Sequence, residues 1–122
     1  MFVKENVVQE KSYEFALRIV KLHRWLCETK KEFVLAKQIL RSGTSIGANV
    51  EEAIGGQSEK DFHSKMTIAY KESRETHYWL RLLHDAEFID NKLYQSIIAD
   101  CEELLKLIGS ITKTMRSKIR NS

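Results

Sequence analysis

The sequence predicts an all-α protein: an antiparallel up-down-up-down four-helix bundle, formed by one domain over residues 1–122. Apolar residues recur every three or four positions along almost the whole chain, which is the spacing of one face of an α-helix. The chain has no proline and only five glycines, which disfavours the many tight turns of a β-sandwich or barrel. Short polar links between the helical segments favour consecutive helices that lie side by side.

The first predicted helix extends from about Val8 to Cys27 and carries two apolar stripes. One stripe consists of Tyr13, Ala16, Val20, His23 and Cys27, and the other of Phe15, Ile19, Leu22 and Leu26. Two stripes on one helix indicate two buried faces. The polar residues 28–31 are expected to link this helix to the next one.

The second predicted helix contains an apolar seam that steps alternately by three and four residues. Its members are Ala36, Ile39, Gly43, Ile46, Val50 and Ala53. Gly43 and Gly47 each lower helix propensity by roughly 1 kcal/mol, so we expect a neighbouring helix to approach closely there. A phosphate-binding glycine loop is disfavoured because no strand precedes it and no lysine motif follows it. Gly55 and Gly56 end the helix, and adjacent glycines favour a left-handed cap.

The third and fourth predicted helices have clear start signals. Ser58 is the expected N-cap of the third helix, and Asp90 or Asn91 begins the fourth. The third helix carries one stripe of Phe62, Met66, Ala69, Ser73, Thr76, Leu80 and Leu83 and a second of Ile68, Trp79, Leu82 and Ala86. The seam of the fourth helix consists of Tyr94, Ile97, Cys101, Leu104, Ile108, Ile111 and Met115.

A polar stripe borders the core along the second helix and faces two glutamates of the third. Carboxylates on a largely apolar helix face need hydrogen-bond partners. We therefore predict that Arg41, Ser45 or Asn49 donates hydrogen bonds to Glu72 or Glu75. The residues assigned to structural polar pairing are Arg41, Ser45, Asn49, Glu52, Glu72 and Glu75.

The sequence shows no pattern typical of a catalytic or metal site. A di-metal carboxylate site in a helix bundle requires Glu three residues before His, and none of the four histidines has one. Cys27 and Cys101 lie at helical core positions and form no CxxC pair. We therefore expect a protein that is not an enzyme and that holds neither a metal nor a cofactor.

The strongest local charge bias lies at the C-terminal end of the chain. The net charge is +3, and no acidic residue follows Glu103. In an up-down bundle the last helix ends near the start of the first, so cations from both can form one surface that contacts phosphates. The candidate nucleic-acid-binding residues are Lys4, Lys11, Lys106, Lys113, Arg116, Lys118 and Arg120. The alternative is a solvated helix end whose cations favour the negative pole of the helix dipole.

The apolar pattern also predicts a location and an assembly state. No apolar run approaches the roughly 20 residues that span a bilayer, and the N-terminal residues lack the core of a signal peptide. We therefore expect a cytoplasmic protein with no membrane contact. The first and third helices carry more apolar surface than a lone bundle buries. Exposure of Phe15, Ile19, Leu22 and Leu26, or of Trp79 and Leu82, would leave an apolar patch, which favours a homo-oligomer.

Two segments carry a family resemblance. QILRSGTSIGANVEEA (residues 38–53) and KESRETHYWL (residues 71–80) resemble the four-helix bundle proteins related to those encoded in intervening sequences of bacterial 23S ribosomal RNA genes. Many members have proline at the position of Gly47 and glycine at that of Ala53, so the second helix can differ locally here. The best markers are Ser45-Ile46-x-x-Asn49-x-x-Glu52 and Glu72-x-x-Glu75.

The resemblance implies a small bacterial protein that assembles into a ring-like homo-oligomer, with a pentamer favoured. The chain is similar to the accessory variability protein of diversity-generating retroelements, a basic pentameric barrel that binds nucleic acid and a reverse transcriptase. We therefore expect a non-enzymatic oligomer that binds structured RNA or the DNA backbone through a basic surface. The alternative is a protein-binding scaffold or accessory subunit without direct nucleic-acid contact.

Overall fold

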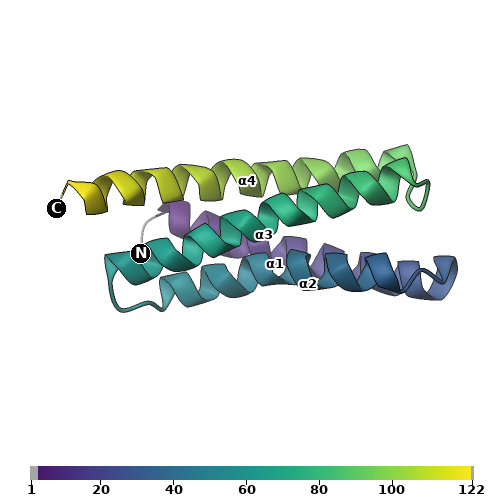
Figure 1. Cartoon of the computed structure of the whole chain (residues 1–122), viewed down its shortest axis with the longest axis horizontal. Helices are drawn as coiled ribbons and strands as arrows, with labels where there is room; N and C mark the ends of the chain where they lie inside the picture. The colour runs from purple at the N-terminus through teal and green to yellow at the C-terminus, as the bar shows by residue number, and fades with distance from the viewer. Residues whose placement is uncertain (1–2, 122) are drawn as a thin grey trace.

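The computed structural model describes residues 3–121, with side chains from Asn6 onward, and these residues form a four-helix bundle without strands. The long helices lie lengthwise beside one another, and the start of the first helix and the end of the last lie toward the left of the bundle (Figure 1). The all-α prediction is confirmed. The elements are α1 (Val3–Trp25), a short π-helix η1 (Leu26–Lys30), α2 (Val34–Ile54), α3 (Glu59–Asp85) and α4 (Asn91–Arg120).

The first helix is longer than the sequence predicted. It begins at Val3 and not near Val8, and residues 28–30, which we assigned to a polar link, continue it as η1. The backbone N–H of Lys31 donates to the carbonyl oxygen of Leu26, and Lys31 then leaves the helix with a left-handed φ of 55°. Because the fully buried Leu26 anchors this turn in the core, the polar residues on its exposed side do not end the helix.

The predicted N-caps are confirmed, whereas the predicted cap after α2 is wrong. Ser58 Oγ accepts a hydrogen bond from the N–H of Asp61 at 3.0 Å, and the Asp90 carboxylate accepts one from the N–H of Leu93 at 2.9 Å. Each cap satisfies an N–H that has no partner within its helix. Gly55 has a φ of −81° and is not left-handed, because the chain leaves α2 through an ordinary turn.

One seam from each helix lines the core. The buried stripe consists of Phe15, Ile19 and Leu22 of α1 and Leu26 of η1. The expectation that this stripe forms an exposed assembly patch is therefore wrong, because the core of the single chain buries it. The other predicted stripe of α1 is not buried within this chain: Tyr13 is 64% exposed, and Val20 and the neighbouring Leu17 are exposed too. Ile68 of the second α3 stripe is also exposed. The prediction of two buried faces is therefore not met inside the single chain, since each helix has neighbours on one side only.

Two glycines of α2 allow α1 to approach closely, as the sequence predicted. A Cβ on Gly43 would lie 2.7 Å from Cγ1 of Ile19, and a Cβ on Gly47 would lie 3.3 Å from the carbonyl oxygen of Ser12. Both neighbours belong to α1. The tight contact between the two helices therefore requires small residues at these positions, and it offsets their low helix propensity.

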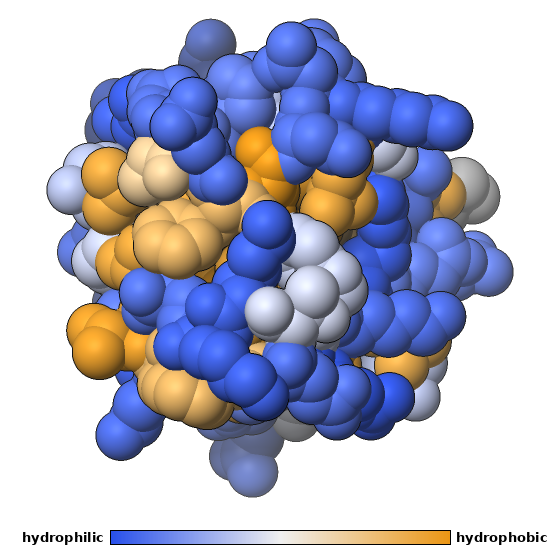
Figure 2. All heavy atoms as spheres, turned by 90° about the vertical axis from the view of Figure 1, so that its right-hand side faces the viewer, coloured by the Kyte–Doolittle hydropathy of each residue, from blue (hydrophilic) through white to orange (hydrophobic). Residues whose placement is uncertain are grey.

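Apolar residues also gather at the end of the bundle that holds the links between α1 and α2 and between α3 and α4 (Figure 2). Phe33 and Val34, which precede and begin α2, are both exposed in this region. Hydrophilic residues surround the apolar groups in the same view. Among the helices described, none is long and apolar enough to cross a membrane.

Candidate functional site

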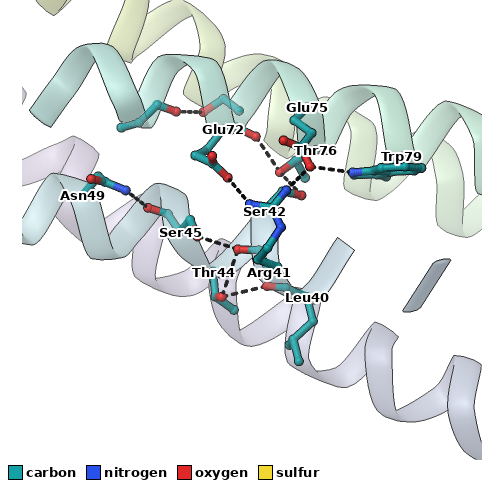
Figure 3. A network of polar contacts seen from close by, with 12 residues as sticks. Leu40, Arg41, Ser42, Thr44, Ser45, Asn49, Glu72, Glu75, Thr76 and Trp79 are labelled. Atoms are coloured by element: carbon teal, nitrogen blue, oxygen red, sulfur yellow. Dashed lines mark hydrogen bonds and ion pairs between the residues drawn. The ribbon is translucent and has the colours of Figure 1, made fainter. Parts of the chain in front are cut away.

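Arg41 of α2 reaches two carboxylates on α3 (Figure 3). Its Nη1 lies 3.3 Å from Oε2 of Glu72, and its Nη2 contacts Oε2 of Glu75. The two glutamates lie three residues apart on one side of α3, so a single guanidinium can engage both. The structure thus brings together three of the residues assigned to polar pairing.

Further hydrogen bonds extend this contact along the interface between α2 and α3. Trp79 Nε1 donates to Glu75 at 2.9 Å, so Glu75 lies between the guanidinium and the indole (Figure 3). Thr76 Oγ1 donates to Ser42 Oγ at 2.9 Å, and both hydroxyls are buried. We call Arg41, Ser42, Glu72, Glu75, Thr76 and Trp79 the interhelix network. Its polar groups satisfy one another, which is typical of a structural interface.

The structure does not bring Ser45, Asn49 or Glu52 to these glutamates. Ser45 Oγ donates to the carbonyl oxygen of Arg41 at 2.6 Å, and Asn49 Nδ2 donates to the carbonyl oxygen of Ser45 at 2.8 Å. Such bonds to the preceding turn are the nearest alternative for short polar side chains in a helix. Glu52 instead pairs with Lys65 of α3 at 3.3 Å.

The protein shifts the pKa values of the two glutamates in opposite directions. Burial raises the pKa of Glu72, and the attraction of Arg41 opposes that rise only in part. The hydrogen bond from Trp79 lowers the pKa of Glu75, and Arg41 lowers it further. The pKa of Arg41 is raised, chiefly by its hydrogen bond to Glu75. Glu75 is therefore the principal carboxylate partner of the guanidinium.

Neutralising the two glutamates is expected to affect stability differently. Glu75→Gln should destabilise the protein at neutral pH, because a lowered pKa means that folding favours the ionised form. That contribution is present above the pKa of the unfolded chain and is lost as the pH falls through the folded pKa. Glu72→Gln should change stability little at neutral pH, since its raised pKa reflects the burial of a charge. Thermal unfolding measured from neutral to acidic pH tests both, and an equal loss in the two variants would contradict the assignment.

The structure places the predicted basic residues in different surroundings. Lys11 of α1 lies 3.2 Å from Glu103 of α4, and Lys118 lies 3.2 Å from Glu59 of α3, so each has an acidic partner. The side chain of Lys4 lies outside the described residues. The other four cations are exposed on α4: Lys106, Lys113, Arg116 and Arg120.

These four cations lie on the side of α4 that adjoins α3. Glu102 Oε2 lies 3.2 Å from Nε2 of His77, and a Cβ on Gly109 would lie 3.1 Å from Cε1 of Tyr70. Lys106 follows Glu102 by four residues. Lys113, Arg116 and Arg120 follow Gly109 by four, seven and eleven residues. These spacings keep all four cations on that side of the helix. On α3, two exposed arginines adjoin the same surface. We call the combined set the basic face: Arg74, Arg81, Lys106, Lys113, Arg116 and Arg120.

A hollow between α3 and α4 adjoins the basic face. Its volume is about 370 Å³, and Tyr70, Arg74, His77, Arg81 and Leu105 line it. The prediction of a basic surface from the C-terminal cations together with Lys4 and Lys11 left out these two arginines, which lie in a segment without a local excess of positive charge. Their seven-residue spacing, with Tyr70 and His77 on the same stripe, is the signal that identifies them.

The histidine and cysteine side chains are candidates for metal ligands and for nucleophiles. No group of three or more His, Cys, Asp or Glu side chains that could hold a metal ion occurs in the described part of the chain. Burial raises the pKa of the Cys101 thiol to about 12, so this thiol stays protonated at neutral pH. Cys27 is only half-buried, and its Sγ lies 3.6 Å from Nε2 of His23.

Comparisons with known proteins agree with this architecture. The sequence profile of one family, described as 23S rRNA-intervening sequence protein, matches residues 4–110. A crystal structure of a protein of unknown function from the S23 ribosomal protein family of Bacteroides thetaiotaomicron is 55% identical in sequence, with a TM-score of 0.89. The similarity covers 91% of this chain and 99% of that chain. No curated protein matches the chain.

Proposed function

Because this chain belongs to the family of 23S rRNA-intervening sequence proteins, we propose that it binds structured RNA or DNA through the phosphate backbone. The observation that carries the proposal is the basic face, in which two adjacent helices present exposed cations. Phosphate contacts of this kind depend on clustered Lys and Arg and carry little sequence information. The protein acts in this proposal by binding alone, without a catalytic step or a cofactor.

Ion pairs within the molecule determine which cations are free to contact phosphates. Lys11 and Lys118 are each held by a glutamate, which reduces their attraction for a phosphate. Glu102 of α4 contacts His77, which lines the hollow. The basic face therefore presents a local excess of positive charge that attracts a polyanion. The proposed backbone contacts are thus centred on α3 and α4 and less on the start of α1.

We further propose that an up-down-up-down bundle is the unit of a ring-like homo-oligomer, with the family resemblance favouring a pentamer, in the bacterial cytoplasm. The exposed stripe of Tyr13, Leu17 and Val20 on α1 supports assembly, because such a patch is typical of a protein contact. Light scattering at micromolar concentration tests this point. A monomeric mass would contradict it.

The same apolar stripe favours a second candidate function, a protein-binding scaffold or accessory subunit with no nucleic-acid contact. In that case a partner protein would cover Tyr13, Leu17 and Val20, and the basic face would be only a solvated surface. The two candidates differ in the effect of removing charge from α4. Nucleic-acid binding requires the basic face, whereas partner binding through α1 does not.

Removing three cations of α4 is expected to weaken nucleic-acid binding for all sequences alike. We expect the variant with Lys113→Gln, Arg116→Gln and Arg120→Gln to bind both structured RNA and duplex DNA about tenfold more weakly, a loss of about 1.4 kcal/mol. On duplex DNA, the slope of log affinity against log salt should fall by about 0.9 for each lost contact. Fluorescence anisotropy across a salt series measures both quantities.

A matched control removes the same charge elsewhere. Lys21, Arg24 and Lys37 are exposed on α1 and α2, away from the basic face. Replacing these three by Gln should leave the salt slope almost unchanged. An equal loss in the two triple variants would show that net charge and not the basic face controls binding. No binding by the unaltered protein even at low salt would favour the scaffold.

A further inference from the structure

Tyr78 of α3 is an exposed aromatic residue beside the basic face. Its side chain is 48% exposed, and its ring lies across that of Trp79, with the centroids 5.0 Å apart and the planes at 71°. Trp79 is itself fixed by its hydrogen bond to Glu75, which Arg41 also engages. The interhelix network thus holds Trp79 in place beside the half-exposed ring of Tyr78.

Two arginines of the basic face flank this ring. Arg74 precedes Tyr78 by four residues and Arg81 follows it by three, and these spacings place side chains next to one another on a helix. Cζ of Arg81 lies 5.8 Å from the ring centroid, within the range of a cation–π contact. Both arginines also line the hollow beside α4. An aromatic surface and two groups suited to bidentate phosphate binding therefore lie together on one helix.

This combination suits an unpaired nucleotide better than a paired one. An unpaired base can stack on an aromatic ring whatever its identity, while Arg binds the adjoining phosphates. In a duplex the bases are already stacked on one another, so an aromatic ring at the surface finds only base edges and phosphates.

Building on the proposed function, we propose that Tyr78 stacks on an unpaired base of a bound RNA whose adjoining phosphates lie at Arg74 and Arg81. Loops, bulges and strand ends of a structured RNA supply such bases. The aromatic ring gives the site a preference that the basic face alone does not have. A cationic surface by itself binds any phosphate backbone.

Two RNA probes separate stacking from backbone binding. One is a blunt duplex, and the other is the same duplex with a short single-stranded adenosine extension. We expect the unaltered protein to bind the extended duplex about tenfold more tightly, the size of effect that one base stacked on an aromatic residue produces. Tyr78→Leu should abolish this preference and leave the affinity for the blunt duplex unchanged. Tyr78→Phe should keep the preference, because the ring remains.

Phe33→Leu is the matched control, since Phe33 is an exposed aromatic residue just before α2, outside both the basic face and the apolar stripe of α1. It should bind both probes as the unaltered protein does. A second measurement uses the unaltered protein, so it does not depend on how the variants fold: an extension that carries photoreactive 4-thiouridine should crosslink to Tyr78. Crosslinks confined to other residues would overturn the stacking proposal.

The stacking proposal and the proposed function fail in different ways. Equal binding of the two probes, or a preference that survives Tyr78→Leu, overturns the stack and leaves backbone binding in place. An equal loss of affinity for both probes in Tyr78→Leu also overturns the stacking proposal, because Tyr78 would then contact the RNA backbone. If neither probe binds at low salt, the proposed function itself is wrong.

Discussion

Replacing Phe15 by alanine is expected to lower the free energy of unfolding by about 3–5 kcal/mol. Phe15 is 2% exposed and belongs to the core stripe of α1. Truncation removes the apolar ring and leaves a cavity, because close-packed neighbours relax only in part. Chemical denaturation monitored by circular dichroism measures the change.

Tyr13→Ala is the matched control on the opposite side of α1. Tyr13 is exposed, so its removal should change the unfolding free energy by no more than about 0.5 kcal/mol. If the oligomer forms through this face, Tyr13→Ala should instead reduce the mass measured by light scattering. A large loss of stability in Tyr13→Ala together with a small one in Phe15→Ala would show that Tyr13, and not Phe15, faces the core.

Replacing Gly43 by valine is expected to destabilise the protein by about 3 kcal/mol. A Cβ at this position would lie 2.7 Å and 2.8 Å from the two γ carbons of Ile19. These atoms lie next to the backbone of a fully buried, β-branched residue, so they cannot turn away easily. Relief requires α1 and α2 to separate, which disturbs the packing of the core around Ile19. The shift of the denaturation midpoint measures this loss.

Gly55→Ala provides the comparison for this variant. Gly55 is exposed with a φ of −81°, and a Cβ there would have ordinary contacts, with 3.6 Å to its nearest neighbour. We expect a change of less than about 0.5 kcal/mol. If the Gly43→Val variant is as stable as the unaltered protein, α1 and α2 are not in close contact at Gly43.

The interhelix network shows how far residue type and spacing can predict a polar contact. Two carboxylates on an apolar helix face need hydrogen-bond donors, and this need indicated Arg41 as a partner. The structure places the guanidinium of Arg41 against both carboxylates. The same reasoning named Ser45 and Asn49, which bond to the preceding turn of their own helix. A long side chain crosses between helices, whereas a short one finds a nearer acceptor in its own backbone.

The basic face shows a different limit of the sequence pattern. The cations of α4 follow one another closely and are evident as a local excess of charge. Arg74 and Arg81 are separated from them by more than twenty residues and join them only because α3 packs against α4. Lys11, which the sequence placed in the same surface, pairs with Glu103 instead. Which charges combine and which cancel depends on the packing of the helices.

Sequence patterns alone predicted the helical class, the core seams of α2 and α4, and the caps at Ser58 and Asp90. These features are local, because periodicity within a helix and the chemistry of its first turn are encoded in consecutive residues. The packing of the helices sets which stripe of α1 faces the core, which glutamate Arg41 engages most strongly, and which cations share a surface. Each of these depends on the rotation of one helix against another, which follows from the packing of side chains distant in the sequence.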